Sequence, residues 1–179
     1  VSLSSPIKKV IIDGNITEIG DLTFTFCDNL SEITIPETVT YIGESAFSFC
    51  SNLTSITIPD SVTSIGEDAF YNCSNLTSIE IPNNVTSIGD WAFSSCSSLT
   101  SVTIGNSVTS IGNYAFYNCS SLTSVNYTGT IDQWAQIEFV DDAANPIYYA
   151  KKLYINGELV TEANITTATK INSYAFYDC

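Results

Sequence analysis

The hydrophobic positions of this chain recur with a fixed period of 23 residues. In the stretch LTSITIPDSVTSIGEDAFYNCSN, apolar side chains stand at Leu53, Ile56, Ile58, Val62, Ile65, Ala69, Phe70 and Cys73. Close copies begin at Leu30, Leu76 and Leu99, and a diverged copy begins at Ile7. One copy cannot bury these side chains alone, whereas stacked copies give each one an identical neighbour on either side. The pattern therefore predicts a repeat solenoid.

Each copy contains signals for short elements. Ser55–Ile58 is rich in β-branched residues and ends at Pro59, which has no N–H to donate, so it predicts a strand. Val62–Ile65 predicts a second short extended segment. Glu67–Cys73 is too short for a long helix and predicts one or two helical turns. The core should then consist of stacked leucines, isoleucines, phenylalanines and cysteines.

The regular repeat is interrupted after Tyr127. Thr130–Phe139 predicts a short helix, because Thr130 and Gln133 have the spacing of a capping box, and Trp134 should pack onto the end of the stack. Residues 140–149 predict a loop. Asn156-Gly157 between two apolar segments predicts a two-residue β-hairpin over residues 153–160. This region is interpreted as a local excursion from the coil.

These signals predict one domain over residues 1–179. Regular repeats should cover about 7–127, an insertion about 128–160, and a partial repeat about 161–179. The chain begins at Val1 without a Met and ends at Cys179 in the middle of a repeat. We therefore expect it to be a fragment of a longer chain.

The repeat resembles the leucine-rich-repeat family, specifically its BspA-like class of surface proteins. Three blocks carry the resemblance: Ile58-Pro59, the V-T-S-I-G block Val62–Gly66, and the A-F-x-x-C block Ala69–Cys73. The resemblance implies a β-rich, right-handed leucine-rich-repeat solenoid with short strands and short helical turns. It also implies an exported protein, extracellular or at the cell surface, because members of this class bind host matrix proteins or mediate adhesion.

The charge balance narrows the choice of partners. The net charge is −14, from 19 acidic and 5 basic residues, with no Arg or His and with every Lys outside residues 10–150. Nucleic-acid binding requires a basic surface, and anionic membranes require basic clusters, so neither partner is expected. No apolar run reaches the roughly 20 residues of a membrane span, so no membrane insertion is expected.

The cysteines predict a buried column rather than a chemical site. Cys27, Cys50, Cys73, Cys96 and Cys119 recur every 23 residues, and Cys179 has the same phase. Their inward position favours free thiols over disulfides. Without a C-x-x-C pair or a histidine, no metal site and no Ser–His or Cys–His nucleophile are expected. The Glu67-Asp68 pair varies between copies, so no enzyme activity and no cofactor are expected.

Two sets of exposed side chains are candidates for ligand binding. The first set should project outward from the strands: Thr54, Thr57, Thr77, Glu80, Thr100 and Thr103. The second set, Trp91 and Tyr114, lies beside the expected helical turns, where exposed aromatic rings suit contacts with protein or sugar. Alternatively, the first set is only a solvated β-surface and the second only covers the core.

The sequence thus predicts an exported cell-surface binding protein. It would mediate protein–protein or cell adhesion contacts with host matrix or neighbouring cells, through an extracellular protein or glycan ligand. The alternative is a ligand-free structural spacer domain of a larger surface protein.

Overall fold

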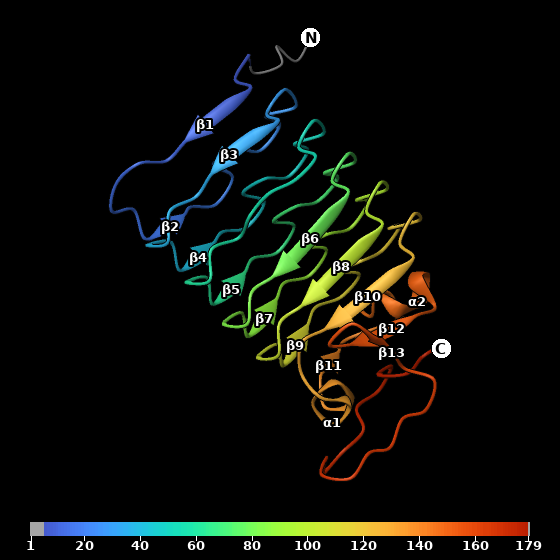
Figure 1. Cartoon of the computed structure of the whole chain (residues 1–179). Helices are drawn as coiled ribbons and strands as arrows, with labels where there is room; N and C mark the ends of the chain where they lie inside the picture. Colours follow the sequence, from blue (N-terminus) through green and yellow to red (C-terminus); the bar gives the residue numbers. More distant parts are fainter. Residues whose placement is uncertain (1–5, 179) are drawn as a thin grey trace.

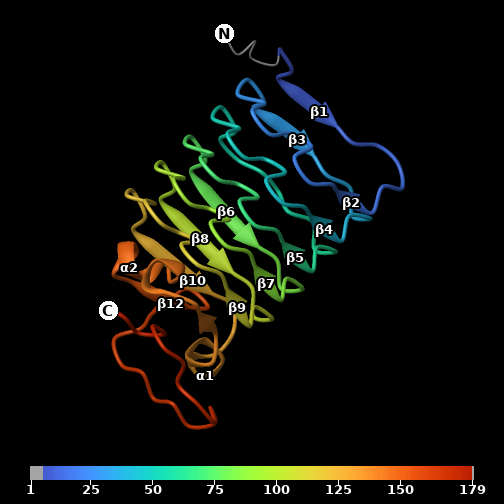
Figure 2. The same ribbon diagram turned by 180° about the vertical axis from the view of Figure 1, so that it is seen from behind.

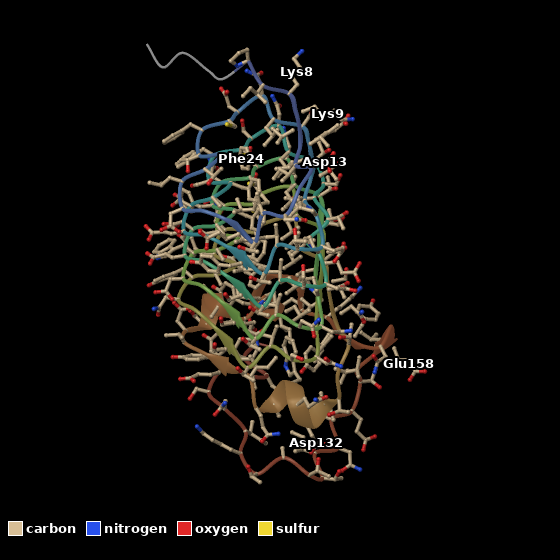
Figure 3. The ribbon with its side chains drawn as sticks, turned by 90° about the vertical axis from the view of Figure 1, so that its left-hand side faces the viewer. Lys8, Lys9, Asp13, Phe24, Asp132 and Glu158 are labelled. Atoms are coloured by element: carbon tan, nitrogen blue, oxygen red, sulfur yellow. The ribbon has the colours of Figure 1, made fainter. Side chains whose placement is uncertain are left out.

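The chain folds into an elongated coil in which each repeat forms one turn (Figure 1). This computed structural model describes residues 6–178. Lys8 and Lys9 lie at one end of the stack, whereas Asp132 lies at the other (Figure 3). The predicted repeat solenoid is confirmed.

One face of the coil, the strand face, carries parallel strands from successive turns. They are β1 (Lys9–Ile11), β3 (Glu32–Thr34), β6 (Ser78–Ile81), β8 (Ser101–Ile104), β10 (Ser124–Tyr127) and β12 (Leu153–Ile155). β6 and β8 pair with a 23-residue offset, which places Glu80 beside Thr103. Side chains alternate along each strand, so that Ile79 and Ile81 are buried while Glu80 is exposed.

The strand face is interrupted at Ser55–Ile58, where the sequence predicts a strand. β3 pairs only with β1, and β6 is the edge of a separate sheet. Ile56 and Ile58 are buried as the repeat requires. However, among the described residues no backbone hydrogen bond joins 55–58 to a neighbouring turn. The apolar pattern therefore holds this segment in the core, but the ladder that defines a strand is missing and the strand prediction is wrong here.

The second short extended segment of each copy is confirmed. It forms a six-stranded parallel sheet of two-residue strands: β2 (Glu18–Ile19), β4 (Tyr41–Ile42), β5 (Ser64–Ile65), β7 (Ser87–Ile88), β9 (Ser110–Ile111) and β11 (Glu138–Phe139). In β5, Ile65 points into the core and Ser64 is half-buried. The two sheets therefore enclose the isoleucine columns between them.

The third side of the coil, the turn side, consists of residues 20–27, 43–50, 66–73, 89–96 and 112–119. The predicted helical turns are wrong here, because two residues of each unit adopt left-handed backbone angles, as Asp68 (φ 52°) and Asn72 (φ 56°) do. The N–H groups of Asp68, Phe70 and Asn72 donate to carbonyls of the next turn, each at 2.8 Å. The alternate N–H groups of Ala69, Tyr71 and Cys73 bond locally to the carbonyl three residues earlier, so bonds between turns alternate with tight local turns and no continuous helix forms. Seen from behind, successive turns lie side by side along the coil (Figure 2).

Side chains of one kind stack through the core. The rings of Phe47, Phe70 and Phe93 are fully buried and nearly parallel, with centroids 5.2 Å apart. The five described cysteines are free thiols, as their phase predicts, whereas Cys179 lies outside the described residues. The Cys96 thiol donates to the carbonyl of Phe70 at 3.2 Å, so each buried thiol ties one turn to an earlier one.

A column of glycines sets the distance between turns. A Cβ atom on Gly66 would lie 2.7 Å from the backbone of Gly43, and one on Gly89 would lie 2.5 Å from the backbone of Gly66. Real Cβ atoms do not approach a backbone so closely. These glycines are required because the backbones of adjacent turns touch.

Residues 128–152 form one longer turn of the coil, although the sequence alone predicts an excursion from it. β11 pairs with β9 and β12 pairs with β10, in both cases with an offset of 28 residues, as Leu153 beside Val125 shows. The hairpin prediction is confirmed, since β12 pairs in antiparallel fashion with β13 (Glu158–Leu159). The five additional residues lie between β10 and β11.

Short helices occupy this longer turn. α1 (Ile131–Ala135) begins with the predicted capping box, in which the N–H of Gln133 donates to Thr130 and the N–H of Thr130 donates to the Gln133 side chain. The prediction that it extends to Phe139 is wrong, because the backbone of Glu138 and Phe139 pairs with β9. The predicted loop at 140–149 contains a 3₁₀-helix, Asp142–Ala144, and α2 (Ile147–Ala150).

Trp134 packs onto the end of the stack, as predicted. Its ring is fully buried, with centroids 5.4 Å from Tyr127 and 5.3 Å from Phe139. Its indole N–H donates to the carbonyl of Ala175 at 2.8 Å. The C-terminal segment is thereby attached to the core.

Candidate binding surfaces

The outermost threonines of the strand face use their hydroxyl groups within the protein. The hydroxyl of Thr77 donates to the carbonyl of Thr54 at 3.2 Å, and that of Thr100 donates to Thr77 at 3.0 Å. All three side chains are exposed, as predicted. The Thr77 and Thr100 protons are nevertheless already bonded, so these two hydroxyls present acceptor lone pairs rather than free donors.

Thr57, Glu80 and Thr103 form a second row on the strand face. Thr57 and Glu80 are exposed and Thr103 is half-buried. Beside the break at Ser55–Ile58, a hollow of about 430 Å³ is lined by Ser55, Thr57, Ser78 and Glu80, with Glu37 and Asp60 at its border. This polar hollow could hold water or a polar ligand group.

Trp91 and Tyr114 lie on the turn side, in segments separate from the six strand-face candidates. Their rings stack with centroids 4.5 Å apart, and Tyr117 contacts both rings edge-on, at 6.1 and 5.7 Å. Tyr114 is 40% exposed and Tyr117 is 46% exposed, so these rings do not merely cover the core. The eight predicted site residues therefore lie on two surfaces and do not converge on one site.

Sequence reasoning missed the start of this aromatic row. Phe26 and Phe49 stack with centroids 4.7 Å apart, and Phe49 meets Tyr71 edge-on at 5.3 Å. Phe26 is 61% exposed and Leu22 is 62% exposed. A sequence signal existed, because Asn72 and Asn118 occupy the repeat position at which Phe26 and Phe49 are apolar.

These side chains line an open groove, here called the edge groove. Its volume is about 490 Å³, and its walls include Leu22, Phe26, Phe49, Tyr71, Glu67 and Asp68, with Trp91 at one end. The groove crosses four turns of the coil. The groove therefore offers an aromatic wall, in which Phe26 and Phe49 stack and Tyr71 meets Phe49 edge-on, with the carboxylates of Glu67 and Asp68 beside it.

Several aromatic residues of the turn side, half-buried or exposed, have a strained backbone. Trp91 (φ 56°), Tyr114 (φ 54°) and Phe49 (φ 62°) are left-handed. This conformation costs an ordinary residue about 1–2 kcal/mol, and Asn or Asp tolerate it better than bulky residues. The fold requires the backbone angle at these positions but does not require an aromatic side chain.

Carboxylates accompany the aromatic row. Asp21, Glu44, Glu67 and Asp90 stand one repeat apart, next to the glycine column. The pKa of the Asp68 carboxyl is raised, first by partial burial and then by the nearby charges of Glu67, Glu44 and Asp90. Ion pairs in the described part of the chain join Lys9 to Glu32 and Lys151 to Asp178, near its two ends. The negative charge beside the edge groove has no cation of its own.

The thiols are not poised for chemistry. Burial raises the pKa of Cys50 and of Cys119 to about 12, and it raises the pKa of Cys73 and Cys96 well above the usual range. A protonated, buried thiol is neither a nucleophile nor a metal ligand at neutral pH.

Residues 6–178 contain neither a cluster of metal-binding side chains nor a membrane-spanning helix. No group of three or more His, Cys, Asp or Glu side chains is arranged to hold a metal ion. None of the helices is long and apolar enough to span a bilayer.

The stacked turns, parallel strand face and repeating apolar columns define a leucine-rich-repeat solenoid. The model of the BspA type leucine rich repeat region matches residues 17–145 in six copies. The chain belongs to this family, as its repeat blocks predict. No curated protein sequence matches it.

Three solved structures from bacteria are similar to this chain. A leucine rich cell surface protein from Faecalibacterium prausnitzii is 34% identical over 74% of this chain, with a TM-score of 0.71. A leucine-rich repeat protein from Bacteroides ovatus is 37% identical over 67% of the chain (TM-score 0.63), and one from T. pallidum is 35% identical over 66% (TM-score 0.64). The chain covers 35%, 31% and 58% of these three proteins, respectively.

Proposed function

We propose that this chain is an exported, cell-surface binding domain that makes adhesion contacts with an extracellular protein or glycan. Family membership and the similarity to a bacterial cell surface protein support the location. A repeat solenoid presents a long, regular surface, and it needs no catalytic group to function as a scaffold for binding.

The exposed aromatic row is the observation that carries this proposal. Aromatic side chains dominate binding energies at interfaces, because they offer large contact areas with few rotatable bonds. Here they are exposed at positions where the left-handed backbone makes them costly for folding. Selection for stability alone would favour Asn or Asp at these positions, as Asn72 and Asn118 illustrate.

The strand face supports the proposal less strongly. The hydroxyl protons of Thr77 and Thr100 are bonded to the protein's own carbonyls. Thr57, Glu80 and Thr103 remain candidates for polar contacts, because among the described residues their side chains form no hydrogen bond. We therefore rank the turn side first and the strand face second.

A binding screen with two face-specific variants tests the proposal. The purified chain is passed over immobilised extracellular matrix proteins and a glycan panel. One variant carries Trp91→Ser and Tyr114→Ser, because Ser45 adopts the same backbone angle at the equivalent position. The other carries Thr57→Ala, Glu80→Ala and Thr103→Ala. Circular dichroism establishes that each variant is folded.

Saturable binding that is lost in the turn-side variant and kept in the strand-face variant is the expected result. Loss only in the strand-face variant would move the site to that face. If the folded protein binds no member of either panel, the adhesion role is contradicted and the ligand-free spacer becomes the better explanation.

A further inference from the structure

The edge groove combines aromatic rings and carboxylates in one place. Its wall contains Phe26, Phe49 and Tyr71, and Glu67 and Asp68 lie beside these rings. Cations bind over aromatic faces, and carboxylates attract the same groups, so the two features favour one kind of ligand. A neutral sugar would use the rings and could donate hydroxyl hydrogen bonds to the carboxylates, but it would leave their negative charge unbalanced.

The charge distribution favours a cationic ligand. All five Lys residues lie outside residues 10–150, and the chain has no Arg. Glu67 and Asp68 line the groove, and Glu44 and Asp90 also act on Asp68, so these carboxylates repel one another with no cation among them. The raised pKa of the Asp68 carboxyl reflects partial burial first and then this repulsion. A bound cation would relieve it.

In the C-terminal unit, an aromatic ring and a carboxylate together contact a lysine side chain of the protein itself. The ammonium group of Lys151 lies over the Tyr148 ring, 5.0 Å from its centroid, and forms an ion pair with Asp178. Tyr148 stacks on Tyr177, which has the repeat phase of Tyr71. At this edge of the coil, therefore, an aromatic ring and a carboxylate hold one lysine side chain between them.

The geometry of the groove suits an extended segment. The rings of Phe26, Phe49 and Tyr71 succeed one another at 4.7 and 5.3 Å along the coil. In an extended chain, side chains on one face recur about every 7 Å. A segment lying along the coil could therefore place two cationic side chains, about 7 Å apart, over the wall formed by these three rings.

We propose that the edge groove binds an extended polypeptide segment rich in Lys or Arg. This inference rests on the proposed binding function and specifies its site and the chemistry of its partner. The aliphatic parts of the Lys or Arg side chains would pack on Phe26, Phe49 and Tyr71. Their charged ends would reach Glu67 and Asp68 at the border.

The experiment measures binding of a synthetic peptide of alternating Lys and Ser by calorimetry, with a Glu–Ser peptide as the negative control. Variants take their substitutions from other turns of the same coil, which keeps them compatible with the fold. Tyr71→Ser copies Ser48 and Ser94, and Glu67→Asn with Asp68→Ser copies Asn113 and Ser45. A matched control, Glu37→Asn with Asp60→Asn, removes two charges from the strand face by copying Asn83, which has the same repeat position as both.

We expect the Lys–Ser peptide to bind with an affinity that falls as salt is added. Tyr71→Ser and the groove charge variant should each weaken binding by about tenfold, whereas the strand-face control should change it by less than about twofold. Equal weakening in the two charge variants would overturn the proposal, because it would indicate only a general attraction to an acidic protein.

The outcomes separate this inference from the adhesion role. If neutral glycans or a matrix protein bind and the Lys–Ser peptide does not, the cationic ligand is contradicted while the binding function stands. If nothing binds, both fail. If Tyr71→Ser does not fold, Phe49→Asn, which copies Asn72, provides the same test at the neighbouring ring.

Discussion

At the scale of single residues, the glycine column decides how closely the turns approach. Gly43, Gly66, Gly89 and Gly112 each bring the backbones of two turns into contact. Gly20 has the same repeat position at the start of the coil, but a Cβ there would meet only the Thr23 hydroxyl, at 3.6 Å. The same residue type is thus required inside the stack and dispensable at its first turn.

Gly89→Ala should destabilise the protein, because its Cβ would lie 2.5 Å from the backbone of the preceding turn. Overpacking of this kind typically costs about 1–3 kcal/mol. Urea denaturation should show a lower midpoint for Gly89→Ala and an unchanged one for the control Gly20→Ala. Equal midpoints in the two variants would show that the turns are not in backbone contact.

The buried thiols make stability sensitive to alkaline pH. Their pKa values are raised in the folded state, to about 12 for Cys50 and Cys119, whereas an unfolded thiol titrates near 8.5. The folded state therefore holds these protons more tightly. Stability is fully present below about pH 8.5 and is lost as pH rises towards 12.

The variant Cys73→Ala with Cys96→Ala should lose less stability than wild type between pH 7 and pH 9.5. For each thiol removed, the loss of unfolding free energy between the two pH values should be smaller by about 1 kcal/mol. The reason is that one pH unit above the unfolded pKa corresponds to about 1.4 kcal/mol. Urea unfolding at both pH values measures the difference. Identical losses in the two proteins would mean that the thiols ionise freely in the folded state.

At the scale of elements, the sequence predicts the strands and helix starts whose side chains carry a clear pattern. The strands β6, β8 and β10 follow from alternating polar and apolar residues, and the start of α1 follows from the spacing of Thr130 and Gln133. The turn side could not be predicted in the same way. The spacing of Ala69, Phe70 and Cys73 is compatible with a helix, and only the left-handed angles at Asp68 and Asn72 exclude one.

Other features could not be predicted because the pattern of buried side chains does not report on them. Ser55–Ile58 has the side-chain pattern of β6 but lacks its backbone ladder, and side-chain pattern does not report on main-chain pairing. The 28-residue turn does not match the 23-residue period, so the period alone does not predict that residues 128–152 continue the coil. Among the candidate surfaces, Trp91 and Tyr114 are predicted from sequence, whereas Phe26 and Phe49 are not, because the 23-residue pattern reports the buried columns and neither residue belongs to one.

Residues 166–168, within the segment after β13, are held by one carboxylate on α1. Asp132 accepts hydrogen bonds from the N–H groups of Thr166, Thr167 and Ala168, at 2.9, 2.6 and 2.7 Å. These bonds lower the pKa of the Asp132 carboxyl. Its contribution to stability is therefore present above the unfolded pKa of about 3.9 and is lost as pH falls through the lower folded value.

Asp132→Ala should release residues 166–168 without unfolding the coil. Hydrogen exchange at these three amides should become faster at neutral pH, while exchange in β8 and β10 stays slow. Glu138→Gln, which removes an exposed carboxylate from the neighbouring β11, serves as the control. Unchanged exchange at 166–168 in Asp132→Ala would contradict this anchoring role.

At the scale of the whole molecule, the identical turns make length adjustable in steps of one repeat. Deleting residues 76–98 joins Asn75 to Leu99 and stacks Phe70 against Phe116. The deletion variant should stay folded and unfold cooperatively, with a smaller dependence of stability on denaturant because less surface is buried. Deleting 76–97 instead leaves every later side chain one position out of register. That variant should lose its cooperative transition, and an equally cooperative one would show that register is not essential.

The hydrogen bonds that join successive turns also determine how the protein responds to mechanical force. They run along the coil axis on the strand face, on the second sheet and on the turn side. A pull on the two ends therefore loads the contact of one turn with the next, and we expect terminal turns to peel away one after another. Each 23-residue turn would release about 80 Å of extended chain. A tether built in this way lengthens in equal steps under traction, and it can recoil when the load falls.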